Sequence, residues 1–113
     1  MRILLDECVH AEVKVAFPGH FTRTVSEVGW SGLKDGPLLN LAQEQFDVFV
    51  TIDRRLEQQQ ELGKFRLGFV IARVPSNEIS SYQPVFAALR EAAENVKTGE
   101  VRSVNHPRMI RDQ

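Results

Sequence analysis

Hydrophobic residues in this chain form short runs that alternate with more polar segments. Unbroken apolar runs dominate three stretches, RILL (2–5), FDVFVTID (46–53) and LGFVIARV (67–74). Continuous runs of this length are typical of strands whose two faces are both buried. Two further stretches, HFTRTV (20–25) and EVRSVN (100–105), alternate polar and apolar residues. The pattern therefore predicts five strands.

The segments between these strands have the spacing and composition of helices. Pro18 and Gly19 end the first of them, and Pro37 suits the first turn of the second, because proline has no N–H to donate there. A glycine-rich loop at 29–37 precedes the second helix. The predicted helices cover residues 10–17, 38–45, 54–62 and 79–97.

The order of elements indicates the fold class. Strands that alternate with helices predict crossover connections and a parallel sheet with helices on both faces. We therefore expect an α/β fold with three layers, α/β/α, around a mostly parallel central sheet. A length of 113 residues is that of one domain, so residues 1–113 are expected to form a single unit.

Composition narrows the function classes. The net charge of −1 gives no general attraction to nucleic acid, so any such contact must come from a local patch. One cysteine excludes an intramolecular disulfide and favours a reducing compartment. No signal-peptide segment and no apolar stretch of about 20 residues is evident. We therefore expect a cytoplasmic protein without membrane association.

Acidic residues follow two of the predicted buried strands. Asp6 and Glu7 end the first strand, Asp53 ends the third, and Asp35 lies in the loop that enters the second main helix. Ligands of parallel α/β sheets bind at the carboxyl ends of the strands. If the first and third strands are neighbours, Asp6 and Asp53 repel each other. A bound Mg²⁺ or Mn²⁺ would reverse that cost, because hard cations prefer oxygen ligands.

A purely structural interpretation accounts for the same acids. Asp is common at helix N-caps, where its carboxylate accepts bonds from free N–H groups. Asp35 precedes Gly36 and Pro37 at a predicted helix start, and Asp6 precedes another helix. Either residue could be only a cap. The recurrence of an acid at two strand ends favours the metal hypothesis.

Several motifs, in the order in which they occur, resemble those of a known family. ILLDE (3–7), VGWSGLKDGPLLNLAQEQFDVFVTIDRR (28–55) and GFVIARV (68–74) resemble the small PIN-like domains of the DUF5615 type, which are related to toxin-type PIN ribonucleases. The resemblance spans nearly the whole chain, although each motif is short. It implies a PIN-like fold and an acidic site that binds Mg²⁺ or Mn²⁺. The residues that match the acidic set are Asp6, Glu7, Asp35 and Asp53.

The chain departs from the family pattern at two places. Cys8 stands where the family usually has Asn, and Arg55 and Leu56 stand where it usually has Asp and Phe. The second departure replaces an acid near the site with a cation. Two consequences remain open: Arg55 reduces metal affinity or activity, or it faces the nucleic-acid backbone.

Hydrolysis of RNA phosphodiester bonds is the chemistry that this site would perform. Divalent cations can activate water and stabilise both the phosphoryl group and the leaving oxygen. Asp6 and Asp53 are expected to be direct metal ligands, while Asp35 and Glu7 bind through water or orient the nucleophile. Arg54 and Arg55 could hold phosphate. Thr51 is either a hydrogen-bond partner of this site or merely a good strand former.

Other residues have weaker signals. Cys8 and His10 are too few to form a zinc site, and we expect Cys8 to be a packed thiol. Trp30, in the glycine-rich loop, is interpreted as a plug over the core edge in preference to a base-stacking platform.

Two functions from different classes remain. The first is a metal-dependent endoribonuclease, the toxin of a toxin–antitoxin pair, with RNA as substrate and an antitoxin protein as partner. The alternative is a catalytically weak PIN-like module that binds a protein or RNA. A receiver-like phosphoacceptor domain is disfavoured, because the strand at 67–74 ends without a lysine. The apolar stripe of the 79–96 helix also predicts a homodimer.

Overall fold

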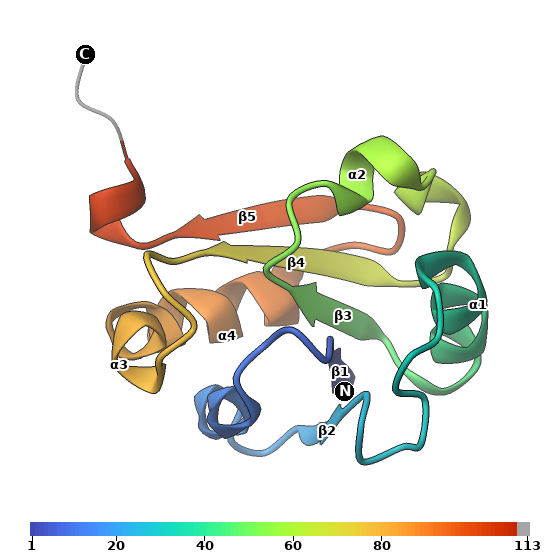
Figure 1. Ribbon diagram of the computed structural model, residues 1–113, viewed down its shortest axis with the longest axis horizontal. Helices are drawn as coiled ribbons and strands as arrows, with labels where there is room; N and C mark the ends of the chain where they lie inside the picture. Colours follow the sequence, from blue (N-terminus) through green and yellow to red (C-terminus); the bar gives the residue numbers. More distant parts are fainter. Residues whose placement is uncertain (111–113) are drawn as a thin grey trace.

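A five-stranded parallel sheet forms the centre of the computed structural model, which describes residues 1–110. Every pairing is parallel, and the strand order is β2-β1-β3-β4-β5 (Figure 1). The predicted α/β class and five strands are confirmed, and the sheet is all-parallel where a mostly parallel one was expected. The strands are β1 (Arg2–Leu5), β2 (Phe21–Thr24), β3 (Val48–Thr51), β4 (Gly68–Arg73) and β5 (Val101–Asn105).

Helical segments cover both faces of this sheet. Three of the four predicted helices form differently. The 10–17 segment forms a 3₁₀ helix, the 54–62 segment forms only the four-residue α2 before η2 begins, and the 79–97 segment is divided into α3, η3 and α4. Pro84 lies within η3, and its missing N–H cannot continue an α-helical ladder. The elements are η1 (Ala11–Ala16), α1 (Asp35–Gln45), α2 (Leu56–Gln59), η2 (Leu62–Lys64), α3 (Ile79–Tyr82), η3 (Gln83–Val85), α4 (Phe86–Asn95) and η4 (Pro107–Met109).

Alternate residues of each strand belong to two separate cores. Ile3 and Leu5 pack in one cluster with η1, α3 and α4, whereas Leu4 packs in the other with α1 and α2. Successive side chains of a strand point to opposite faces, so the fully apolar run of β1 supplies both cores at once. This arrangement is consistent with the three layers expected from the sequence.

The apolar face of α4 is covered by the chain itself. Leu89 and Ala93 have no exposed surface and pack in the same core as β1 and β4. The stripe that suggested a homodimer is therefore already buried in one copy, and homodimerisation stays a prediction without that support. Within residues 1–110, no helix has the length and apolar character needed to cross a membrane.

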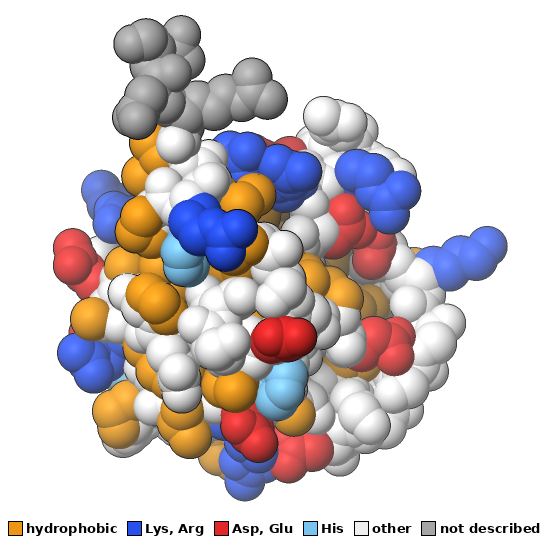
Figure 2. All heavy atoms as spheres, turned by 60° about the vertical axis from the view of Figure 1, so that its left-hand side comes forward, with side chains coloured by type: hydrophobic (Ala, Val, Ile, Leu, Met, Phe, Trp, Pro, Cys, Tyr) orange, Lys and Arg blue, Asp and Glu red, His pale blue; other side chains and the backbone are white. Residues whose placement is uncertain are grey.

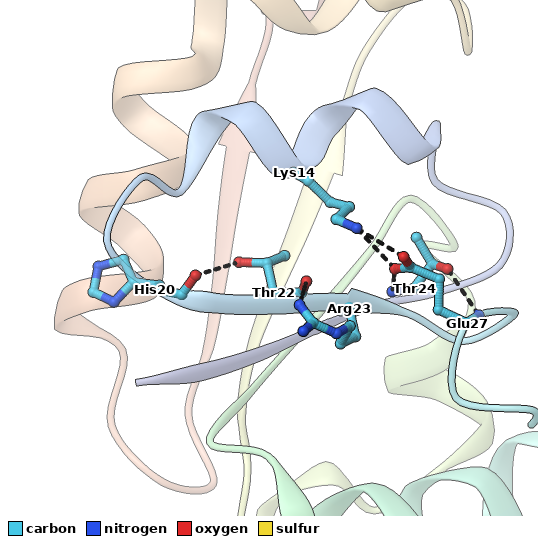
Figure 3. Close-up of polar contacts among 6 residues, drawn as sticks. All are labelled: Lys14, His20, Thr22, Arg23, Thr24 and Glu27. Carbon is cyan, nitrogen blue, oxygen red and sulfur yellow. Dashed lines mark hydrogen bonds and ion pairs between the residues drawn. The ribbon is translucent and has the colours of Figure 1, made fainter.

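Side chains protect the outer edge of β2. Arg23 donates to the carbonyl of Thr22 at 2.9 Å, and Glu27 accepts from the backbone N–H of Thr24 at 2.8 Å (Figure 3). Lys14 in turn holds Glu27 through an ion pair of 2.8 Å. Unpaired backbone groups on an edge strand can recruit another strand, so these bonds reduce that risk at β2.

The strand order has a reversal beside β1. β2 lies on one side of β1, and the chain then continues on the other side through β3, β4 and β5. In doubly wound sheets, ligands bind outside the carboxyl ends of the strands where this reversal occurs. Here that position lies between β1 and β3. The acidic residues that follow these two strands in the sequence, Asp6 and Asp53, lie at this carboxyl edge.

Candidate acidic site at the carboxyl edge of the sheet

Asp6 and Asp53 follow the two strands that flank the reversal. β1 pairs directly with β3, so the condition under which Asp6 and Asp53 come close, that the first and third strands are neighbours, is met. Asp6 comes directly after β1, and its backbone N–H donates to the carbonyl of Val50 at 2.9 Å. Asp53 lies two residues beyond the end of β3. Both side chains are partly exposed.

A buried threonine hydroxyl joins the two strand ends. Thr51 has no exposed surface, and its hydroxyl donates to Asp6 Oδ2 at 2.7 Å. The Thr51 hydroxyl oxygen in turn accepts from the backbone N–H of Asp53 at 3.0 Å. Thr51 is therefore a hydrogen-bond partner within the site, and the interpretation as a mere strand former is wrong. Its hydroxyl fixes the Asp6 carboxylate relative to the backbone that carries Asp53.

Cys8 is a further donor to Asp6. Its thiol lies 3.4 Å from Asp6 Oδ2 and 3.6 Å from the Thr51 hydroxyl. Burial, and next the charge of Asp6, raise the pKa of the Cys8 thiol. The protonated thiol can donate, which agrees with a packed thiol and not with a metal-binding thiolate. With the N–H of Glu7 at 2.8 Å on the other oxygen, Asp6 accepts three bonds.

Asp35 lies within electrostatic reach of the other acids. Its pKa is raised by burial first and then by the charges of Asp6 and Asp53, while the charge of Arg55 opposes the rise. The charges of Asp6, which follows β1, and of Asp53, which follows β3, thus act on the first residue of α1 at one edge of the sheet. Mutual repulsion of this kind favours protonation or a bound cation.

Capping does not explain Asp6 and Asp35. The N-cap of α1 is Lys34, and Asp35 is already the first residue of the helix. The N-cap of η1 is His10, whose ring nitrogen accepts from the N–H of Glu12. The structural interpretation of these two acids as helix caps is therefore wrong.

Glu7 points toward the glycine-rich loop. Its Oε1 accepts from the backbone N–H of Gly32 at 3.1 Å. Gly32 has φ +83°, a backbone conformation that residues other than glycine rarely adopt. Glu7 is also not among the charges that shift the pKa of Asp35. The structure therefore brings together Asp6, Asp35 and Asp53, and it holds Glu7 against the loop.

Two adjacent arginines after β3 have different surroundings. The Nε of Arg55 lies 3.3 Å from Asp53 Oδ1, and the backbone N–H of Arg55 donates to the same oxygen at 3.0 Å. The Arg55 side chain is 75% exposed. Arg54 instead lines a cavity beyond Asp53. Of the two consequences left open for Arg55, the geometry favours an effect on the acid.

Residues with weaker sequence signals have structural roles. Trp30 packs edge-on against Phe46, with ring centroids 6.1 Å apart, so the interpretation as a plug is supported. His20 lies 2.8 Å from a carboxylate oxygen of Glu94. His106 accepts from the N–H of Arg108 within a turn. These residues lie outside the acidic site.

The donor chemistry fits a hard cation, but the carboxylates do not form a closed ligand shell. Within the described part of the chain, no three His, Cys, Asp or Glu side chains are grouped as a metal centre. Asp6, Asp35 and Asp53 nevertheless offer carboxylate oxygens, and the charges of Asp6 and Asp53 reach Asp35. Oxygen ligands of this kind suit Mg²⁺ or Mn²⁺.

Sequence reasoning assigned no role to Arg73 or Asn105. Arg73, the last residue of β4, lines the same cavity as Arg54. Within residues 1–110, the buried Nε of Arg73 and the Oδ1 of Asn105 have no hydrogen-bond partner. The only available signal was an arginine that ends an apolar strand.

Comparison with family models, with curated proteins and with solved structures found no match for this chain. The interpretation of the site therefore depends on its own residues.

We expect Thr51→Val to destabilise the fold. The substitution keeps the shape of the side chain but removes a donor from Asp6 and an acceptor from Asp53. Loss of buried hydrogen bonds of this kind costs about 1–3 kcal/mol in the free energy of unfolding. Urea denaturation at neutral pH measures the change.

Thr22→Val is the matched control. Thr22 is also buried, and its hydroxyl makes only a 3.4 Å contact with the carbonyl of His20. We expect the control to change the free energy of unfolding by less than about 0.5 kcal/mol. Equal losses for both variants would contradict the linking role of Thr51.

Proposed function

We propose that this chain is a metal-dependent endoribonuclease that hydrolyses RNA phosphodiester bonds. The observation that supports it most is the convergence of Asp6, Asp35 and Asp53 outside the reversal between β1 and β3. The PIN-like resemblance of the sequence agrees with this chemistry. The further proposal that the enzyme is a cytoplasmic toxin with an antitoxin partner depends on that resemblance alone.

The carboxylates of Asp6, Asp35 and Asp53 would hold Mg²⁺ or Mn²⁺ at this edge. Such a cation supplies an activated water and charge stabilisation for the phosphoryl group and the leaving oxygen. The chain's contribution is positioning. Thr51 and Cys8 orient the Asp6 carboxylate through their donors. Burial, and next the charges of Asp6 and Asp53, raise the pKa of Asp35, and a bound cation would offset that repulsion.

The second candidate is a PIN-like module that binds RNA or a protein with little catalysis. The contact between Arg55 and Asp53 favours it, because the positive guanidinium opposes a cation at the same carboxylate. In the nuclease interpretation the cation would bind despite that charge. The two candidates therefore differ in the affinity of the site for metal.

We expect Mn²⁺ to raise the melting temperature of the protein. A ligand that binds only the folded state stabilises it in proportion to the logarithm of its concentration. At ten times the Kd, the midpoint should rise by about 5 °C. Differential scanning calorimetry at increasing Mn²⁺ concentration gives the shift.

The control for this experiment is a monovalent salt at the same ionic strength. Screening of the three carboxylates alone would raise the midpoint equally in that control. Asp6→Asn should remove the part of the shift that is specific for Mn²⁺. If the midpoint does not move at millimolar Mn²⁺, the metal site and the nuclease proposal both fail.

A further inference from the structure

A small cavity beside the acidic site has lining groups suited to an anion. It has a volume of about 230 Å³ and lies where β3 and β4 end, bounded by the loop after β4 and by η4. Both charged residues that line it, Arg54 and Arg73, are cationic, and no Asp or Glu lines it. The volume suits a phosphate group with part of its sugar, and not a drug-sized ligand.

The donors in this cavity are left without partners. The buried Nε of Arg73 makes no hydrogen bond within the described residues. Asn77 accepts a hydrogen bond from the Tyr82 hydroxyl through its Oδ1, so its amide N–H groups remain free to donate. Buried polar atoms are nearly always paired in native proteins. The buried Oδ1 of Asn105, the residue opposite Arg73 in the β4–β5 register, is also without a partner within the described residues. The Nε of Arg73 can therefore donate to that oxygen or to an acceptor bound in the cavity.

The distribution of charge agrees with this assignment. Figure 2 brings forward the side toward which the arrows of β4 and β5 point in Figure 1. Basic side chains lie mainly across its upper part, and acidic ones mainly across its middle and lower part. A larger cavity, about 400 Å³ between α4 and β5, has Glu91 as well as Arg102 in its lining. The smaller cavity differs in having two arginines and, among the described residues, no carboxylate in its lining.

We propose that the cavity lined by Arg54, Arg73 and Asn77 binds a backbone phosphate of RNA, adjacent to the phosphate at the acidic site. Arg54 directly follows Asp53, so an RNA strand bound at the carboxylates can continue into the cavity. The guanidinium groups donate charge-assisted hydrogen bonds to the phosphate oxygens. This inference rests on the proposed nuclease function for its choice of RNA, but binding can be measured without cleavage.

The experiment measures binding of a short single-stranded RNA in the presence of a metal chelator, by fluorescence anisotropy. Arg73→Gln removes the buried donor and should weaken binding about tenfold. Arg54→Gln, at an exposed position, should weaken binding and lower its salt dependence by about one released counterion. Inorganic phosphate should compete with the RNA in the wild type and lose that competition in Arg73→Gln.

Arg90→Gln is the matched control, because Arg90 is an exposed arginine on α4, away from the cavity. It should leave RNA affinity nearly unchanged. Equal weakening of RNA binding by Arg90→Gln and Arg73→Gln would show that the effect comes from the net charge of the protein, and would overturn the proposal. Arg73→Gln should also keep or raise the melting temperature, because the lost Nε has no partner. A lowered melting temperature would indicate a structural arginine instead.

The outcomes separate this proposal from the nuclease function. Metal-dependent cleavage with unchanged RNA binding in Arg73→Gln overturns the phosphate cavity and leaves the nuclease standing. Binding that depends on Arg73, without cleavage in Mn²⁺, supports the cavity and removes the nuclease function. Absence of RNA and phosphate binding by the wild type overturns the cavity proposal directly.

Discussion

Asp53→Asn should abolish metal-dependent cleavage of RNA while the fold stays intact. The amide is nearly the same size as the carboxylate, and its oxygen can still accept from the N–H of Arg55. It lacks the negative charge that a hard cation requires. Cleavage should fall by two orders of magnitude or more, on the order of a lost electrostatic contact in a transition state. Single-turnover cleavage of a labelled RNA in Mn²⁺ measures the loss.

The stability of this variant should equal or slightly exceed that of the wild type. Asp53 raises the pKa of Asp35 through repulsion, and the variant removes that repulsion. It also removes an ion pair with the largely exposed Arg55, and such surface pairs contribute little. The expected change in the free energy of unfolding is therefore within about 0.5 kcal/mol.

Asp47→Asn is the matched control, because Asp47 lies before the amino end of β3. Its carboxylate accepts from the N–H of Arg2 at 2.7 Å, at the opposite edge of the sheet. The control should cleave RNA like the wild type. Full metal-dependent cleavage by Asp53→Asn would exclude Asp53 from the site. A wild type that binds Mn²⁺ but cleaves no single-stranded RNA would favour the binding module.

Strand positions could be predicted from the sequence because their signal is local. The run around β3 is continuously apolar over 48–50 and is followed by a carboxylate at Asp53, so its place in a covered sheet follows from the sequence pattern alone. The positions of Asp6 and Asp53 follow from the same argument, since both come just after predicted strands. Their adjacency required only that β1 and β3 pair, which the structure confirms.

The broken helices were harder to predict because their geometry depends on tertiary packing. The segment at 79–97 has helical spacing on both sides of Pro84, yet η3 interrupts it. The η1 segment tightens to a 3₁₀ helix while Val13 and Ala16 stay buried. Spacing alone does not separate these forms, because three- and four-residue repeats overlap over so few turns.

The cavity beside the site could not be predicted for a related reason. Arg73 and Asn77 are brought to Arg54 by a loop after β4 and by η4 near the end of the described chain. The spacing of these residues in the sequence does not indicate that they lie together. The Cys8 thiol is a similar case, since its contact with Asp6 depends on the turn that follows β1.

Arg55→Ala should increase the affinity of the site for Mn²⁺. The guanidinium lies 3.3 Å from Asp53 Oδ1 and also acts on Asp35, so its charge opposes a cation at the same carboxylates. Removal of one exposed charge a few ångströms from a divalent ion should lower the Kd about tenfold. The dependence of the melting temperature on Mn²⁺ concentration gives the Kd of each variant.

Arg54→Ala provides the comparison for this prediction. It removes the same charge from the neighbouring position, but Arg54 faces the cavity and is not among the charges that shift the pKa of Asp35. Its effect on the Kd for Mn²⁺ should be smaller, and its effect on RNA binding larger. If Arg55→Ala instead weakens RNA binding and leaves the Kd for Mn²⁺ unchanged, Arg55 contacts the nucleic-acid backbone. The ion pair with Asp53 would then have no bearing on metal binding.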